Sequence, residues 1–135
     1  MAAVTFIVTM VLAVAGYFYV QRNSKLEMER RFADREHLDI ERVCDLFCQG
    51  GLTDRPMVRE LIEHVAGVLS VSPSVLRPTD RFEFELRPAR GSEFDSDRNT
   101  LLLDLARLAK KRKQPLDTAS IKTLGDYLQA MAKVY

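Results

Sequence analysis

The sequence has little of the chemistry on which enzymes and disulfide-rich proteins depend. Its 135 residues include no tryptophan, two histidines and two cysteines. Cys44 and Cys48 are four residues apart, and on a helix this spacing holds the sulfur atoms at the wrong distance and angle for an unstrained disulfide. No histidine stands beside a nucleophile in the chain, and there is no glycine-rich phosphate loop and no recognisable catalytic carboxylate pair. We therefore expect a non-catalytic protein with reduced thiols.

A strong excess of charge is also absent, as is the pattern of a strand. Lys and Arg number 20 against 19 Asp and Glu, a net charge of +1, which gives no bulk attraction to nucleic acid. No stretch longer than a few residues alternates between apolar and polar side chains. The predicted fold class is all-α. We expect a transmembrane helix over residues 1–20, a juxtamembrane helical stalk over 21–51, and a small bundle of three or four helices over 53–135.

A run without any charged side chain opens the chain, from Ala2 to Val20. At about 1.5 Å per residue, a helix over this run is roughly 28 Å long, close to the roughly 30 Å thickness of a bilayer's hydrocarbon core. Tyr17 and Tyr19 lie near its end, where aromatic rings meet the lipid head groups. The run therefore predicts a single-pass membrane anchor.

The flanks of this run predict its orientation. No Lys or Arg precedes it, whereas four cations follow it closely, so the C-terminal part is expected in the cytoplasm. A cleaved signal peptide is the alternative, because Ala13-Val14-Ala15 has the form of a cleavage site. The missing basic start and the apolar residues beyond Ala15 favour the anchor, and removal of residues 1–15 stays open. The four cations are Arg22, Lys25, Arg30 and Arg31.

The stalk has no proline or glycine from Gln21 to Gln49, so the helix is expected to continue outward from the membrane. Its first part, residues 21–36, is expected to be solvated. From Leu38 onward an apolar face develops that should pack on the domain that follows. Gly50-Gly51 would end the helix. One stripe of possible metal ligands spans about 16 Å, too long for four ligands to meet on one ion, so no metal site is predicted. The stripe consists of His37, Glu41, Cys44 and Cys48.

Three amphipathic helices are predicted in the C-terminal domain. The first runs from about Arg55 to Leu69, and His64 should be exposed on it. The second begins near Ser96 and ends in a basic cluster. The third begins at Thr123, which with Asp126 has the form of a capping box. The expected buried residues are Val58, Leu61, Ile62, Val65 and Leu69, then Leu101, Leu102, Leu105 and Leu108, then Leu124, Tyr127, Leu128 and Met131.

Several short segments between and within these helices follow a familiar order. They are Val71–Phe82 with its two prolines, the acidic step Glu83–Leu86, Asp95-Ser96 at the start of the second helix, Pro115 nineteen residues later, and Ile121–Leu124 with Tyr127-Leu128. In order and spacing they resemble the acyl carrier protein family, over about residues 54–132. The resemblance implies a small helical bundle. It also implies a 4′-phosphopantetheine arm on Ser96, with Asp95 before it and Arg98 as a nearby cation at the helix N-terminus.

The chain also departs from the family's pattern around this serine. Asp97 stands where the family has leucine, and the loop before Ser96 is about six residues longer. The second helix, acidic in the family, is basic here. We therefore expect a carrier-like fold without its arm, which acts as an interaction or recruitment module for a protein partner. The alternative is a working acyl carrier, modified on Ser96, that serves membrane enzymes.

The basic cluster at the end of the second helix is the other candidate site. Near an anionic leaflet each of its four cations would contribute about 1 kcal/mol to binding. No aromatic side chain is interleaved with the cations, which argues against nucleic acid. We expect the cluster to dock on anionic lipid or on an acidic protein face. It consists of Lys110, Lys111, Arg112 and Lys113.

Overall fold

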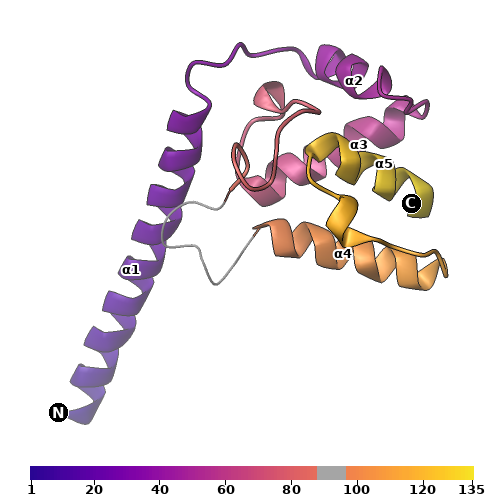
Figure 1. The fold of residues 1–135 in the computed structure, drawn as a ribbon. Helices are drawn as coiled ribbons and strands as arrows, with labels where there is room; N and C mark the ends of the chain where they lie inside the picture. The colour runs from indigo at the N-terminus through magenta and orange to yellow at the C-terminus, as the bar shows by residue number, and fades with distance from the viewer. Residues whose placement is uncertain (88–96) are drawn as a thin grey trace.

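The computed structural model describes residues 1–87 and 97–135, and for Ser24 and residues 97–99 it describes the backbone alone. Within these residues the chain is all-helical and contains no strand, as predicted. Figure 1 shows one long helix standing beside a bundle. The elements are α1 (Ala2–Arg31), α2 (Ile40–Cys48), α3 (Arg55–Leu69), the 3₁₀ turn η1 (Pro73–Val75), α4 (Asp97–Lys111), the 3₁₀ turn η2 (Thr118–Ser120) and α5 (Leu124–Val134).

The N-terminal helix α1 extends well beyond the bundle (Figure 1). Residues 1–20 are all exposed, including their large apolar side chains. The helix is long and apolar enough to cross a membrane, by length and composition alone. The same properties near an N-terminus also fit a signal sequence.

The end of α1 differs from the predicted stalk. Instead of a solvated helix that continues to residue 36, α1 stops at Arg31, and Met28 and Phe32 are buried in the bundle, each with 4% of its surface exposed. The chain then turns and the N–H of Leu38 donates to the carbonyl of Ser74. Helix propensities differ by only a few tenths of a kcal/mol per residue, whereas burying a phenylalanine contributes about 2 kcal/mol. Tertiary contacts therefore end the helix where local preference would continue it.

The bundle is built on α3, which packs against α2, α4 and α5. The apolar face predicted from Leu38 onward does pack on the following domain, and Gly51 after α2 adopts a φ of 106°, which favours glycine. The bounds predicted for the helix over 55–69 are confirmed. Leu102 and Leu108 are only partly buried. The buried residues of these helices are Val43, Cys44, Phe47, Val58, Leu61, Ile62, Val65, Ala66, Leu69, Leu101, Leu105, Ala109, Leu124, Tyr127, Leu128, Met131 and Val134.

The segment between η1 and residue 87 packs on the start of α5. The N–H of Phe82 donates to the carbonyl of Lys122, and the N–H of Gly125 donates to that of Pro78, at 2.9 Å. A Cβ atom at position 125 would lie only 3.0 Å from the Pro78 oxygen, which explains the glycine. The predicted capping box of Thr123 and Asp126 is present. These contacts fix the loop that receives the end of α1.

Candidate functional site

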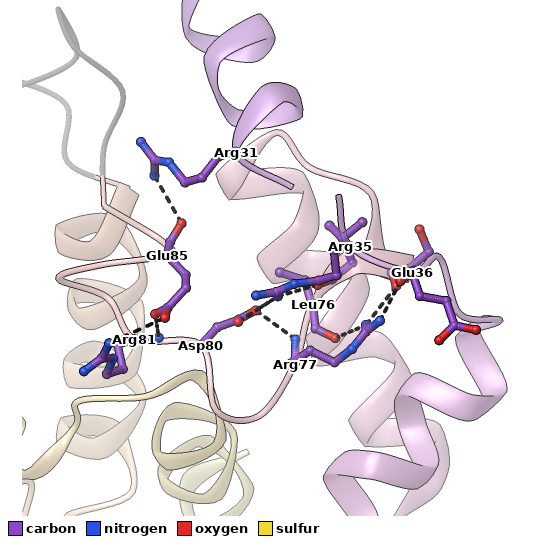
Figure 2. Close-up of polar contacts among 10 residues, drawn as sticks. Arg31, Arg35, Glu36, Leu76, Arg77, Asp80, Arg81 and Glu85 are labelled. Atoms are coloured by element: carbon purple, nitrogen blue, oxygen red, sulfur yellow. Dashed lines mark hydrogen bonds and ion pairs between the residues drawn. The ribbon is translucent and has the colours of Figure 1, made fainter. Parts of the chain in front are cut away.

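A buried carboxylate joins the segment after α1 to the bundle. Asp80 has 2% of its surface exposed, and both of its oxygens accept from Nη1 of Arg35, at 2.7 and 2.8 Å. The same nitrogen donates to the carbonyl of Val75 at 2.8 Å, and the N–H of Arg77 donates to Asp80 at 2.9 Å. Figure 2 shows Arg35 reaching across to Asp80. Asp80 therefore connects the segment that follows α1, through Arg35, to its own loop, through the backbone of Arg77.

Two further arginines cross the same junction. Arg77 donates from its loop to the carbonyl of Glu36 at 2.6 Å, and Arg31, in the last turn of α1, donates to the carbonyl of Glu85 at 3.1 Å (Figure 2). We call Arg31, Arg35, Arg77 and Asp80 the arginine clasp. Most of its acceptors are backbone carbonyls, which position chain segments and carry no reactivity. The clasp therefore fixes the end of α1 against the bundle.

Burial governs the electrostatics of the clasp. It raises the pKa of the Asp80 carboxyl, against the opposing effect of hydrogen bonds from Arg35 and from the backbone of Arg77. Burial also lowers the pKa of the Arg77 guanidinium, and the charge of Arg35 lowers it further. Taking such charges out of water costs free energy that their attraction only partly returns. The clasp is therefore a device for fixing geometry more than for adding stability.

The exposed face of α4 is basic and carries one large apolar side chain. Leu103 has 57% of its surface exposed, and Arg107, Lys110 and Lys111 follow on the same side, opposite the buried leucines. Figure 1 shows α4 crosswise to α1, along the edge of the bundle toward which the N-terminal half of α1 extends. The predicted cluster of residues 110–113 extends past the end of α4 at Lys111. There Arg112 donates to the carbonyl of Tyr135, at 3.2 Å, and Lys113 has a φ of 54°.

The predicted modification site lies outside the described residues. This applies to Asp95 and Ser96, whereas Arg98 lies within α4 but only its backbone is described. The first residue of α4 is Asp97, directly after Ser96. The attachment of a phosphopantetheine arm at Ser96 therefore stays a prediction.

The histidines and cysteines take separate places in the fold. His37 Nδ1 lies 2.7 Å from the hydroxyl oxygen of Ser74, which fastens the segment before α2 to η1. Cys44 is buried, and this burial raises the pKa of its thiol, with a smaller contribution from Glu41. His64 is exposed as predicted, 3.6 Å from Asp104. Among the residues described, no three His, Cys, Asp or Glu side chains are grouped to hold a metal.

A groove lies between the last turns of α1 and the C-terminal end of α3. Its volume is about 770 Å³, within the range of small-molecule sites. Lys25, Glu29 and Phe32 line it from α1, and Ala66 and Gly67 line it from α3. Val75, which also lines the groove, accepts a hydrogen bond from Arg35 of the clasp through its carbonyl, at 2.8 Å.

No protein-family model, curated protein or solved structure gives a significant match to this chain. The sequence pattern also missed the two features that the fold assembles, the clasp and the groove. Arg35 reads as a solvated charge in the mixed run of residues 21–36, and nothing local pairs it with Asp80, 45 residues farther along the chain. One signal was present, since Gly67 interrupts an otherwise good helical pattern.

Proposed function

We propose that the chain is a single-pass membrane protein whose helical domain acts as a non-catalytic interaction module at the cytoplasmic face. The observation that carries this is the junction between α1 and the bundle. A domain that is merely tethered needs only a flexible linker, whereas here Met28 and Phe32 are buried and the arginine clasp fixes the segment that follows. Such a junction would hold the domain in one orientation relative to the membrane.

The same orientation supports docking of α4 on lipid. The exposed side of α4 faces away from the bundle, and α4 lies at the edge toward the N-terminal half of α1 (Figure 1). With α1 across the bilayer, this side would meet the inner leaflet. Four cations at about 1 kcal/mol each would add to the contact of Leu103 with the interface.

The opposite edge of the bundle would then face the cytoplasm and a protein partner. In Figure 1 this edge carries α2. Exposed ion pairs join α2 to α3. Arg55 contacts the carboxylates of both Glu41 and Asp45, and Arg59 lies 3.2 Å from Glu41. Mixed charges of this kind favour a partner with its own interspersed charges.

Lipid docking is tested by placing a fluorophore on α4 of the full-length protein in nanodiscs with and without anionic lipid. Lipids with nitroxide-labelled head groups should quench it strongly in anionic discs. Replacing Lys110, Lys111, Arg112 and Lys113 by Gln should weaken the quenching, because each lost charge removes attraction to the leaflet. The control replaces Arg42, Lys122 and Lys133, exposed cations elsewhere on the domain, by Gln. Equal quenching in the wild type, the cluster variant and the control variant would refute docking of α4 on lipid.

The second candidate function is an acyl carrier with 4′-phosphopantetheine on Ser96. It is favoured by the place of Ser96 directly before α4 and by the order of long α3, long α4, short η2 and α5. A phosphodiester there would meet the free N–H groups of a helix N-terminus. Co-expression with a phosphopantetheinyl transferase should then add the mass of one arm, and Ser96→Ala should prevent it. An unchanged mass would rule out the carrier and favour the interaction module.

A further inference from the structure

The groove between α1 and α3 starts where the apolar part of α1 ends. Lys25, at its lower end, is five residues beyond Val20, or about 7 Å along the helix, which is the depth of the lipid head groups when residues 2–20 span the membrane. From Lys25 the groove follows α1 past Phe32 as far as His37. Any molecule that enters from the leaflet would therefore meet Lys25 first.

The floor of the groove is apolar and includes a glycine that packing does not explain. Phe32, Ala66 and Val75 are buried beneath it, and Val71 is partly buried. Gly67 lies inside α3, where glycine costs about 1 kcal/mol relative to alanine, yet a Cβ atom there would meet nothing within 4 Å. Gly67 thus weakens α3 without relieving any contact inside the chain. The open space beside it is available to a bound molecule.

The charges around the groove favour an anionic group at its lower end. Lys25 is exposed, and no contact of its ammonium group is described within residues 1–87 and 97–135. Farther along, Glu63 is held by Arg59 at 3.2 Å, and Glu29 lies one turn above Lys25. A phosphate at Lys25 would thus be attracted, whereas an anion deeper in the groove would be repelled by the carboxylates.

We propose that this groove binds one phospholipid of the inner leaflet, with its phosphate at Lys25 and part of an acyl chain on the floor beside Gly67. This inference rests on the proposed anchoring of α1 in the membrane. A lipid fits better than a peptide or a second copy of the chain, because a lipid reaches the groove directly from the bilayer. It also matches Lys25 at the lower end of the groove and the apolar floor farther along it.

The test uses the full-length protein in nanodiscs that contain phosphatidylglycerol with a photoactivatable diazirine on one acyl chain. After illumination, the label should appear on the tryptic peptide of residues 60–81, which includes Ala66, Gly67, Val71 and Val75 of the floor. Gly67→Leu fills the groove from a position with free space, and should reduce labelling of this peptide by about tenfold, the effect of losing about 1.4 kcal/mol of binding. Lys25→Glu should reduce it as well, by repelling the phosphate.

Two matched variants serve as controls. Gly67→Ala should keep most of the labelling, because a methyl group leaves the groove open, and Lys133→Glu makes the same charge change at an exposed position of α5. Thermal unfolding of each variant shows whether the bundle is intact. Equal labelling in Gly67→Leu and wild type, or a protein crosslink to residues 60–81 in place of lipid, would refute the proposal. Carbonate extraction of the same protein separates the two proposals. A protein that fails this labelling test but still resists carbonate would keep the anchor and lose only the lipid site.

Discussion

At the scale of single residues, Asp80 and Arg35 are the pair on which the junction depends. They are 45 positions apart in the chain, and their side chains meet only because the loop after α3 folds back to the end of α1. In the sequence, Asp80 stands in the polar stretch Thr79-Asp80-Arg81, and no local pattern marks it as buried. Burial of such a charge is decided by tertiary packing, which local patterns do not encode. The contacts of the clasp therefore could not be predicted from the sequence.

Replacing Arg35 by Ala should lower the free energy of unfolding by about 3 kcal/mol, because it leaves the Asp80 carboxylate buried without its partner. The double variant Arg35→Met with Asp80→Leu should recover much of this loss, since it removes both charges. Urea unfolding followed by tyrosine fluorescence measures the effect. Arg30→Ala, on the exposed side of α1, should change stability by less than about 0.5 kcal/mol. A similar loss in both single variants would contradict the role of the clasp.

Asp126 predicts a dependence of stability on pH. Burial acts to raise the pKa of this carboxyl, but hydrogen bonds from the backbone of Thr123 and Lys122 outweigh it and lower the pKa below 3.8. A lowered folded pKa contributes stability that is present above the unfolded value and is lost as pH falls through the folded value. The advantage of wild type over Asp126→Asn in urea unfolding should therefore shrink on acidification below 3.8. A constant difference would show that the capping box carries no ionic contribution.

At the scale of elements, sequence periodicity predicted the bundle helices well and the stalk poorly. The apolar faces of α3 and α5 follow from their i, i+3, i+4 spacing, and the caps at Asp54 and Thr123 mark their starts. The break after α1 carries no such signal, because no proline or glycine lies between residues 21 and 49. It results from Phe32 entering the bundle and from backbone contacts such as that of Leu38 with Ser74.

Phe32→Ala should loosen α1 from the bundle without removing any charge. Truncating a buried phenylalanine costs about 3–5 kcal/mol, and here it also removes the ring that the Arg35 guanidinium covers at 4.9 Å. The segment 32–39 should become a site of fast proteolysis in the full-length protein, while the fragment beyond it stays folded. Phe84→Ala, which removes an exposed ring, is the control. Equal cleavage of both variants would show that Phe32 does not hold the junction.

At the scale of the whole molecule, the expected membrane topology is tested by extraction and by accessibility. Full-length protein in native membranes should resist carbonate, because about twenty apolar residues hold it in lipid. A tag after residue 135 should be protected from protease in sealed right-side-out cells and cleaved in inverted vesicles, as the cations after Val20 predict. An intact mass would exclude removal of residues 1–15. Release by carbonate would overturn the anchor.

With α1 across a bilayer as proposed, the buried end of α1 would couple the tilt of the helix to the bundle. A spanning helix leans further in a thin bilayer and stands straighter in a thick one. Because Met28 and Phe32 are buried and Arg35 contacts Asp80, this tilt would be passed on to the bundle, moving α2 outward or inward and α4 toward the leaflet or away from it. The thickness of the surrounding bilayer would thereby set the orientation of the domain relative to the membrane, without any ligand.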